Sequence, residues 1–257
     1  MTDHFRGRLA LVTGASSGIG ADIARHLAQR GADLILTARR ADRLEALATE
    51  CRLFGVTVQT APADIADPAA RTALAERFPA TDILINNAGL GAFGAFSTTD
   101  EAKITRMIAV NITALTHLTH LFTPSMTSRG WGRIMLVAST AAFQPVPLYA
   151  VYAATKAYVL SFGNALDVEL AAQGVRTSVL CPGTTRTEFF DVAEQTKSGF
   201  VERSAMTSAD VARIGLDGLA KGRATIVAGT MNTAMAIGTR LTPRSLNARI
   251  AYRIMKP

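Results

Sequence analysis

The chain has 257 residues, of which 49% are hydrophobic and 18% are charged, and its net charge is +7. This composition is typical of a globular protein and excludes an intrinsically disordered chain. The two cysteines are too few for a disulfide framework or a cysteine metal site. The sequence shows no signal-like amino terminus and no apolar stretch long enough to span a bilayer, so we expect a cytoplasmic protein.

Positive charge is concentrated at the carboxyl end of the chain. Residues 1–217 hold 20 basic and 20 acidic side chains, whereas residues 218–257 hold seven basic side chains and no acidic one. The net charge is therefore a property of this tail. We expect no nucleic-acid partner for the rest of the protein, because its own charges balance.

Short apolar runs alternate with helical patterns along the chain. The runs predict strands at residues 8–13, 33–38, 56–61, 82–85, 132–138, 175–180 and 225–228. The spacing of apolar residues predicts helices at residues 21–30, 41–54, 68–78, 98–129, 148–173 and 208–221. This alternation predicts a Rossmann-type, doubly wound α/β fold: a single domain with a seven-stranded, mostly parallel sheet flanked by helices.

The basic tail follows the last predicted strand. We expect residues 1–229 to form the domain and residues 230–257 to form an extension packed on or beside it. Leu246, Ile250 and Ile254 recur every four residues there, which predicts a short basic amphipathic helix. Two alternatives are open for this helix. It makes a weak contact with a membrane surface, or it packs on its own subunit, a neighbouring subunit or the mouth of the substrate site.

A glycine-rich turn joins the first predicted strand to the first predicted helix. Gly14, Gly18 and Gly20 form a Gly-x-x-x-Gly-x-Gly pattern at this junction. Glycines let the backbone approach a pyrophosphate, and the start of the helix attracts its negative charge. The segment therefore predicts a dinucleotide site.

The end of the second predicted strand is where a dinucleotide fold meets the adenosine ribose. An acidic residue there selects NAD, whereas arginine suits the 2′-phosphate of NADP. The chain has Ala38 and then Arg39 at this point, with no carboxylate. We therefore predict NADP(H) as cofactor. The alternative is that Arg39 is a solvated charge at the start of a helix.

Tyr152 and Lys156 are four residues apart on a predicted helix, so their side chains share one face. A nearby ammonium lowers the pKa of a phenol, which would suit Tyr152 for acid–base work near neutral pH. The pair alone is more often a core edge beside a solvated amine. Tyr149 is a rival phenol, but it lies seven residues from Lys156.

Together these segments resemble the short-chain dehydrogenase/reductase family in its single-domain form. The resemblance covers residues 5 to about 225. The motifs that carry it stand in the family's order and spacing: Thr13-Gly14-Ala15-Ser16-Ser17-Gly18-Ile19-Gly20, Asp64, Asn86-Asn87-Ala88-Gly89, Asn111, Ser139, Tyr152-x-x-x-Lys156 and Pro182-Gly183-x-x-x-Thr187.

The resemblance implies an NADP(H)-dependent oxidoreductase that acts on the CH–OH group of donors and interconverts a carbonyl and an alcohol. Tyr152 would move the proton, and Lys156 would tune it and hold the nicotinamide ribose. Ser139 would bond the carbonyl oxygen, and Asn111 would seat a water of a proton relay. Besides Tyr152, Lys156 and Arg39, the implied cofactor contacts are Gly14, Ser16, Ser17, Gly18, Ile19, Gly20, Asp64, Ile65, Asn87, Ala88, Gly89, Pro182, Gly183, Thr185 and Thr187.

Apolar residues on the loops expected around the nicotinamide indicate a substrate such as a hydrophobic ketone, an aldehyde or a 3-oxoacyl group. They are Phe93, Phe96, Phe143, Pro145, Val146, Leu148, Phe189 and Phe190. Arg186 either meets an acidic part of the substrate or is a surface arginine. His117 and His120 have a metal-like spacing, but no carboxylate or cysteine completes a site, so we expect no metal.

The family habit implies a homodimer or homotetramer. Two other functions are open besides a reductase with a small-molecule carbonyl or alcohol substrate. One is a catalytically silent NADP-binding sensor or scaffold on the same fold. The other is a peripheral membrane-associated reductase acting on a lipid-like substrate.

Overall fold

The structure is a computed structural model that describes residues 4–189 and 205–255. Seven strands form one sheet in the order β3-β2-β1-β4-β5-β6-β9, and every neighbouring pair is parallel. The predicted doubly wound fold is therefore confirmed. The strands are β1 (Leu9–Thr13), β2 (Asp33–Thr37), β3 (Val58–Thr60), β4 (Ile83–Asn86), β5 (Gly132–Val137), β6 (Val175–Cys181) and β9 (Thr225–Val227).

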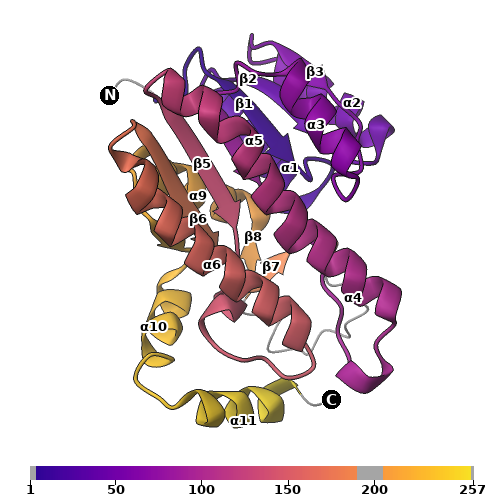
Figure 1. The fold of residues 1–257 in the computed structure, drawn as a ribbon, viewed down its shortest axis with the longest axis vertical. Coiled ribbons are helices and arrows are strands. Elements are labelled where there is room, and N and C mark those ends of the chain that lie inside the picture. Colours follow the sequence, from indigo (N-terminus) through magenta and orange to yellow (C-terminus); the bar gives the residue numbers. More distant parts are fainter. Residues whose placement is uncertain (1–3, 190–204, 256–257) are drawn as a thin grey trace.

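Helices cover both faces of the sheet (Figure 1). One face packs against α1 (Gly18–Gln29), α2 (Ala41–Arg52) and α9 (Ser208–Ala220). The other face packs against α3 (Pro68–Arg77), α5 (Leu115–Ser128) and α6 (Ala150–Ala171). Alternate side chains of one strand enter the two cores, as Val12 and Leu11 do from β1. This burial on both faces is why the strands read as continuous apolar runs.

The long helix predicted at residues 98–129 is found in three parts. α4 (Glu101–Ile108) continues through a π-helical segment (Ala109–Ala114) into α5. The π-helical segment carries Asn111, which is 1% exposed. Such segments are often found at functional sites, because the wider turn redirects a side chain.

Two features beyond the main sheet are not predicted by the sequence patterns. β7 (Thr185–Arg186) and β8 (Met206–Thr207) form a small parallel sheet. α10 (Thr230–Gly238) comes before the predicted tail helix, which is α11 (Arg244–Met255). Both tail helices lie at the foot of the molecule in Figure 1, toward which the arrow of β5 points.

The tail helix turns inward a different face from the one that its apolar stripe suggests. Asn247 and Ala251 are buried, whereas Leu246 is 45% exposed and Ile250 is 47% exposed. Asn247 holds the turn between the tail helices by donating to the carbonyl oxygen of Thr239 at 3.0 Å. The side chain of Ile254 lies outside the described part of the structure. Over the residues described, the apolar stripe is therefore only partly covered by its own subunit.

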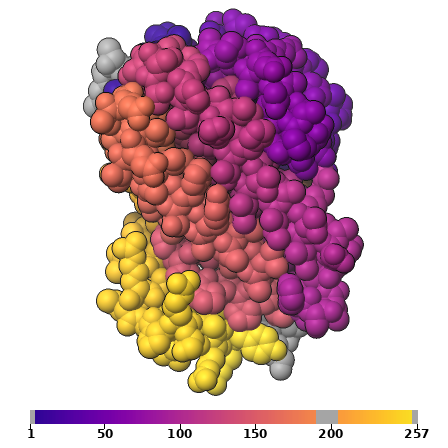
Figure 2. All heavy atoms as spheres, in the orientation of Figure 1, coloured from indigo at the N-terminus to yellow at the C-terminus, as the bar shows by residue number. Residues whose placement is uncertain are grey.

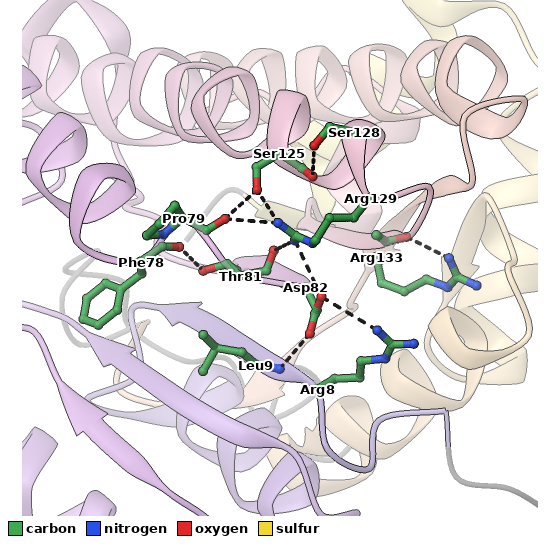
Figure 3. Close-up of polar contacts among 11 residues, drawn as sticks. Arg8, Leu9, Phe78, Pro79, Thr81, Asp82, Ser125, Ser128, Arg129 and Arg133 are labelled. Atoms are coloured by element: carbon green, nitrogen blue, oxygen red, sulfur yellow. Dashed lines mark hydrogen bonds and ion pairs between the residues drawn. The ribbon is translucent and has the colours of Figure 1, made fainter.

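At the other end of the sheet from the tail helices, the amino ends of the strands are tied together around Asp82 (Figure 3). One carboxylate oxygen of Asp82 accepts a hydrogen bond from the backbone N–H of Leu9 at 3.2 Å. The other lies 3.9 Å from Arg8 and 3.6 Å from Arg129. Arg129 also donates to the carbonyl oxygen of Thr81 at 2.7 Å. The amino ends of β1 and β4 and the end of α5 are thereby held to one another.

We predict that Asp82→Ala destabilises the fold, because the change removes the acceptor of the Leu9 N–H and the negative charge beside Arg8 and Arg129. A lost hydrogen bond of this kind costs about 1–3 kcal/mol, which lowers Tm by about 2–4 °C per kcal/mol in a domain of this size. Urea denaturation of Asp82→Ala and of a surface control, Glu76→Ala, measures the effect. Equal stability of the two variants would contradict the role of Asp82.

Candidate active site

A cavity of about 520 Å³ opens at the carboxyl ends of the strands. This is the edge at which doubly wound folds bind their ligands. The cavity collects residues from the loops after β1 to β6 and from α6. Among the predicted site residues, those that line it are Gly14, Ser16, Ser17, Gly18, Ile19, Arg39, Asp64, Ile65, Asn87, Ala88, Gly89, Ser139, Tyr152, Lys156, Pro182, Gly183, Thr185 and Thr187.

Gly20 and Asn111 are the predicted site residues that do not line the cavity. A Cβ atom at Gly20 would lie 2.4 Å from the carbonyl oxygen of Gly14, so Gly20 lets the helix pack closely on the turn. Gly14 itself has φ +65°, and a Cβ atom there would lie 2.8 Å from Cα of Ala88. The glycines thus allow a compact turn beside the loop after β4.

The first turn of α1 offers unsatisfied N–H groups to the cavity. Its N-cap residue, Ser17, makes no side-chain capping bond, and the first turn holds no acidic residue. By contrast, Asp67 caps α3 and Asp100 caps α4. An uncapped helix start of this kind binds anions. The residues present therefore fit the pyrophosphate of a dinucleotide.

Two arginines follow β2, and the second is the better fixed. Arg39 lines the cavity and is exposed. Arg40 donates to the hydroxyl oxygens of Ser16 and Ser17, each at 3.0 Å, and pairs with Glu188 at 3.0 Å. Arg43 holds the other oxygen of Glu188 at 2.5 Å. The cluster already binds one anionic group, so its chemistry fits a phosphate.

The loop after β3 is fixed by an arginine that the motifs do not indicate. Arg71 is 3% exposed and donates to the carbonyl oxygens of Ile65 and Ala66 at 2.6 and 3.1 Å. It also donates to Nδ1 of His117 at 2.9 Å. Burial, with Arg71 and His120, lowers the pKa of His117. Over the described residues no group of three metal-ligating side chains is found.

The polar residues after β4 tie loops together. Nδ2 of Asn87 donates to the carbonyl oxygens of Thr13 and Gly14 at 3.0 and 3.2 Å. Oδ1 of Asn111 accepts from the N–H of Leu90 at 2.8 Å, and its Nδ2 donates to Thr155 at 3.0 Å. The side chain of Asn111 therefore joins this loop to α6. Its predicted part in a water relay stays a prediction.

Ser139 and Tyr152 meet at the wall of the cavity. Oγ of Ser139 accepts from the N–H of Ala141 at 3.1 Å, which leaves its O–H free to donate. Burial raises the pKa of Tyr152 to about 12, although a hydrogen bond with Ser139 acts to lower it. The ring of Tyr152 packs between those of Tyr149 and Phe189, at centroid distances of 5.6 and 5.3 Å.

Lys156 follows Tyr152 on α6 by about one helical turn and is 4% exposed. Its Nζ donates to the carbonyl oxygen of Val137 at 2.8 Å and lies 5.7 Å from the centroid of the Tyr152 ring. Burial lowers the pKa of Lys156 to about 8. The pKa of Tyr152 therefore lies above its ordinary value of 10.0, and not below it as predicted, because desolvation of the phenol is the largest cause of the shift.

A strained residue sets the start of α6. Leu148 has φ +65°, and among the described residues it is the one non-glycine with positive φ. Its carbonyl oxygen accepts from the N–H of Gly94 at 2.9 Å, which ties the turn to the loop after β4. Strain of this kind gathers at functional sites. The turn immediately precedes the helix that carries Tyr152 and Lys156.

The residues predicted around the substrate divide into two groups. Phe143, Val146 and Phe189 line the cavity, whereas Phe93, Phe96, Pro145 and Leu148 do not. Phe190 lies outside the described residues. Arg186 is exposed and is not part of the cavity wall. Lining residues that the motifs do not indicate include Arg40, Arg106, Val110, Gln144, Tyr149, Glu188, Met235 and Thr239.

Comparison with known proteins decides the family. The model of the short chain dehydrogenase family matches residues 8–198. This protein belongs to that family. The sulfoacetaldehyde reductase of Chromohalobacter salexigens is 37% identical to this short-chain dehydrogenase over 78% of the chain and 83% of the relative.

Two further relatives match over only part of their own length. The glycine betaine reductase ATRR of Emericella nidulans is 35% identical over 73% of this short-chain dehydrogenase, which spans 15% of that relative. The ketoacyl reductase HetN of a Nostoc species is also 35% identical, over 69% of the chain and 63% of the relative.

Solved structures give the same fold with two different cofactors. A short-chain dehydrogenase from Sphingobium yanoikuyae in complex with NADPH has a TM-score of 0.82 and 34% identity, with 91% of this chain and 94% of that one covered. A relative from Burkholderia phymatum in complex with NAD has a TM-score of 0.82 and 25% identity, over 91% and 92%. The family thus uses a nicotinamide cofactor. None of the helices described in this short-chain dehydrogenase has the length and apolarity needed to cross a membrane.

The pKa of Lys156 predicts a pH-dependent stability. Between about 8 and the ordinary value of 10.5, the unfolded chain holds a proton that the folded chain has lost. Stability from this group therefore rises as pH increases through that window. We expect the free energy of unfolding of the wild type, measured relative to that of Lys156→Met by urea denaturation, to rise between pH 8 and 10. A difference that does not change with pH would contradict the buried state of the amine.

Proposed function

We propose that this protein is an NADP(H)-dependent reductase of a hydrophobic ketone, aldehyde or 3-oxoacyl group, with Tyr152 as the proton donor. One observation carries the proposal. The hydrogen-bonded Ser139 and Tyr152 share a cavity with the buried amine of Lys156, the uncapped start of α1 and the arginines after β2. This combination brings a proton donor, a donor for the carbonyl oxygen and an anion site to one place.

The cofactor would extend from α1 to Lys156. The N–H groups at the start of α1 would hold the pyrophosphate, and Arg39, Arg40 and Ser16 would hold a 2′-phosphate. Lys156 would hold the nicotinamide ribose. When bound, the nicotinamide supplies the hydride for carbonyl reduction.

The proton would come from Tyr152. A phenol with a pKa of about 12 is fully protonated at neutral pH, which is the form that donates. An alkoxide is a stronger base than a phenolate, so the transfer to the reduced oxygen is downhill. Ser139 would donate its O–H to the same oxygen as charge develops there. The ammonium of Lys156 would then stabilise the phenolate left on Tyr152.

An apolar substrate is supported by the wall of the cavity. Phe143, Val146, Tyr149, Phe189 and Met235 contribute to it, and Arg186 does not. A Cβ atom at Gly91 would lie 2.5 Å from the ring of Phe189, so this glycine leaves the room that the ring occupies. The match to a ketoacyl reductase agrees with such a substrate.

We expect Tyr152→Phe to reduce carbonyl turnover by about 10²–10⁴-fold, because the variant keeps the ring and loses the proton. NADPH consumption against a panel of ketones, aldehydes and 3-oxoacyl thioesters measures the effect, and NADPH fluorescence checks binding. Tyr158→Phe is the control, since Tyr158 bonds Thr116 away from the cavity. Retained turnover in Tyr152→Phe would contradict the assignment. So would a result in which Tyr149→Phe loses turnover and Tyr152→Phe keeps it. NADPH binding without turnover of any substrate in the wild type would favour the silent sensor.

Glu188 competes for the guanidiniums that would hold the 2′-phosphate. Arg43 and Arg40 hold its pKa below the ordinary value, so it is ionised at neutral pH. We predict that Glu188→Gln strengthens NADPH binding by about three- to tenfold, as expected when two exposed ion pairs no longer compete with the phosphate, and leaves NADH binding unchanged. Titration of cofactor fluorescence gives both constants. The control is Glu50→Gln, which breaks a pair with Arg25 on the outer surface. An equal change for NADH would contradict a site for the 2′-phosphate.

A further inference from the structure

The exposed apolar side chains of this protein gather on its tail helices. Seven of the thirteen large hydrophobic side chains that are exposed in the described part of the chain lie between residues 231 and 252. We call them the C-terminal face: Met231, Met235, Ile237, Leu241, Leu246, Ile250 and Tyr252. The yellow spheres of Figure 2 show this segment at the lower end of the molecule. Exposed apolar side chains that concentrate on one segment of a surface are typical of a site that meets a partner.

The same helices carry only positive charge. Arg240, Arg244, Arg249 and Arg253 are exposed, and none of them makes an ion pair within the described residues. The sequence from residue 218 onward contains no acidic side chain. The partner is therefore one that accepts apolar side chains and is itself negative.

We propose that the C-terminal face docks on a membrane surface containing anionic lipids. Leu246, Ile250 and Tyr252 would enter the boundary between headgroups and acyl chains, and the arginines would pair with lipid phosphates. A second copy of the chain fits less well, because a symmetric contact through this face would set arginines against arginines. A nucleic acid has no place for a row of aliphatic side chains.

The position of the face relative to the cavity adds to the proposal. Met235 belongs to the C-terminal face and also lines the cavity. Ala236 and Thr239, which are not part of that face, line the cavity from the same segment. Docking on a membrane would therefore bring the cavity wall close to the lipid surface. An apolar substrate could then pass to the cavity with little exposure to water, and this last step rests on the proposed function.

Vesicle sedimentation without substrate tests the docking independently of the reaction. The full chain is mixed with vesicles of phosphatidylcholine alone or with phosphatidylglycerol, at low and high salt. We expect pelleting with the anionic vesicles only, and weaker pelleting at high salt. Two double variants form the test pairs. One combines Leu246→Ser with Ile250→Ser, and the other combines Arg244→Gln with Arg249→Gln. Each should lower the pelleted fraction severalfold. The matched controls are Arg6→Gln and Leu53→Ser, which changes a side chain that is 84% exposed directly after α2.

Light scattering of the same variants separates the docking surface from an interface between copies. An unchanged molar mass with reduced pelleting supports the proposal, and NADPH turnover of a soluble ketone should be unaffected in both pairs. A wild type that stays in the supernatant, pelleting equal in all variants, or a lower molar mass in the Leu246 and Ile250 pair would overturn it. Loss of turnover in Tyr152→Phe has no bearing on this outcome.

Discussion

The docking of α6 on the sheet is the constraint on which the candidate active site depends. The helix is held at three levels. Lys156 donates to Val137 at the carboxyl edge, and Gly163 lies so close to β6 that a Cβ atom would meet Val179 at 2.3 Å. At the amino edge Asp167 accepts from Arg176 at 2.8 Å and from the N–H of Thr177 at 2.9 Å. Because both ends and the middle are fixed, the side chains of Tyr152 and Lys156 reach the cavity in one defined orientation.

Burying the amine of Lys156 in this orientation costs stability at neutral pH, where the amine is still charged. A buried amine with its pKa lowered to about 8 and a buried phenol with its pKa raised to about 12 both favour their neutral forms. The protein keeps them beside each other although neither gains a counterion from the described residues. Groups that titrate out of their ordinary range in a cleft are characteristic of catalytic sites, where a reaction rather than stability selects them. The two side chains with these shifted pKa values, Tyr152 and Lys156, thus line the cavity where the loops converge.

Much of this arrangement could be predicted from the sequence, and the failures have physical causes. Buried parallel strands and amphipathic helices leave strong periodic signals, so the sheet and α6 were predictable within a few residues. The role of Arg71 was not, because a buried arginine is specified by the carbonyl groups that its loop presents. The two-residue strands β7 and β8 are too short to have a period. On α11 the small residues Asn247 and Ala251 face inward, which the spacing of its larger apolar residues could not show.

The parallel sheet also sets the order in which the protein can assemble. β1 pairs with β4 only after the chain has passed through β2, α2, β3 and α3, so the contact is far from local. Asn87 joins the glycine turn across this same junction. Closing so long a loop is slow, because its entropy is lost before the contact is gained. The glycine turn that would hold a pyrophosphate is therefore completed late in folding, and a cofactor bound there would stabilise only the fully folded chain.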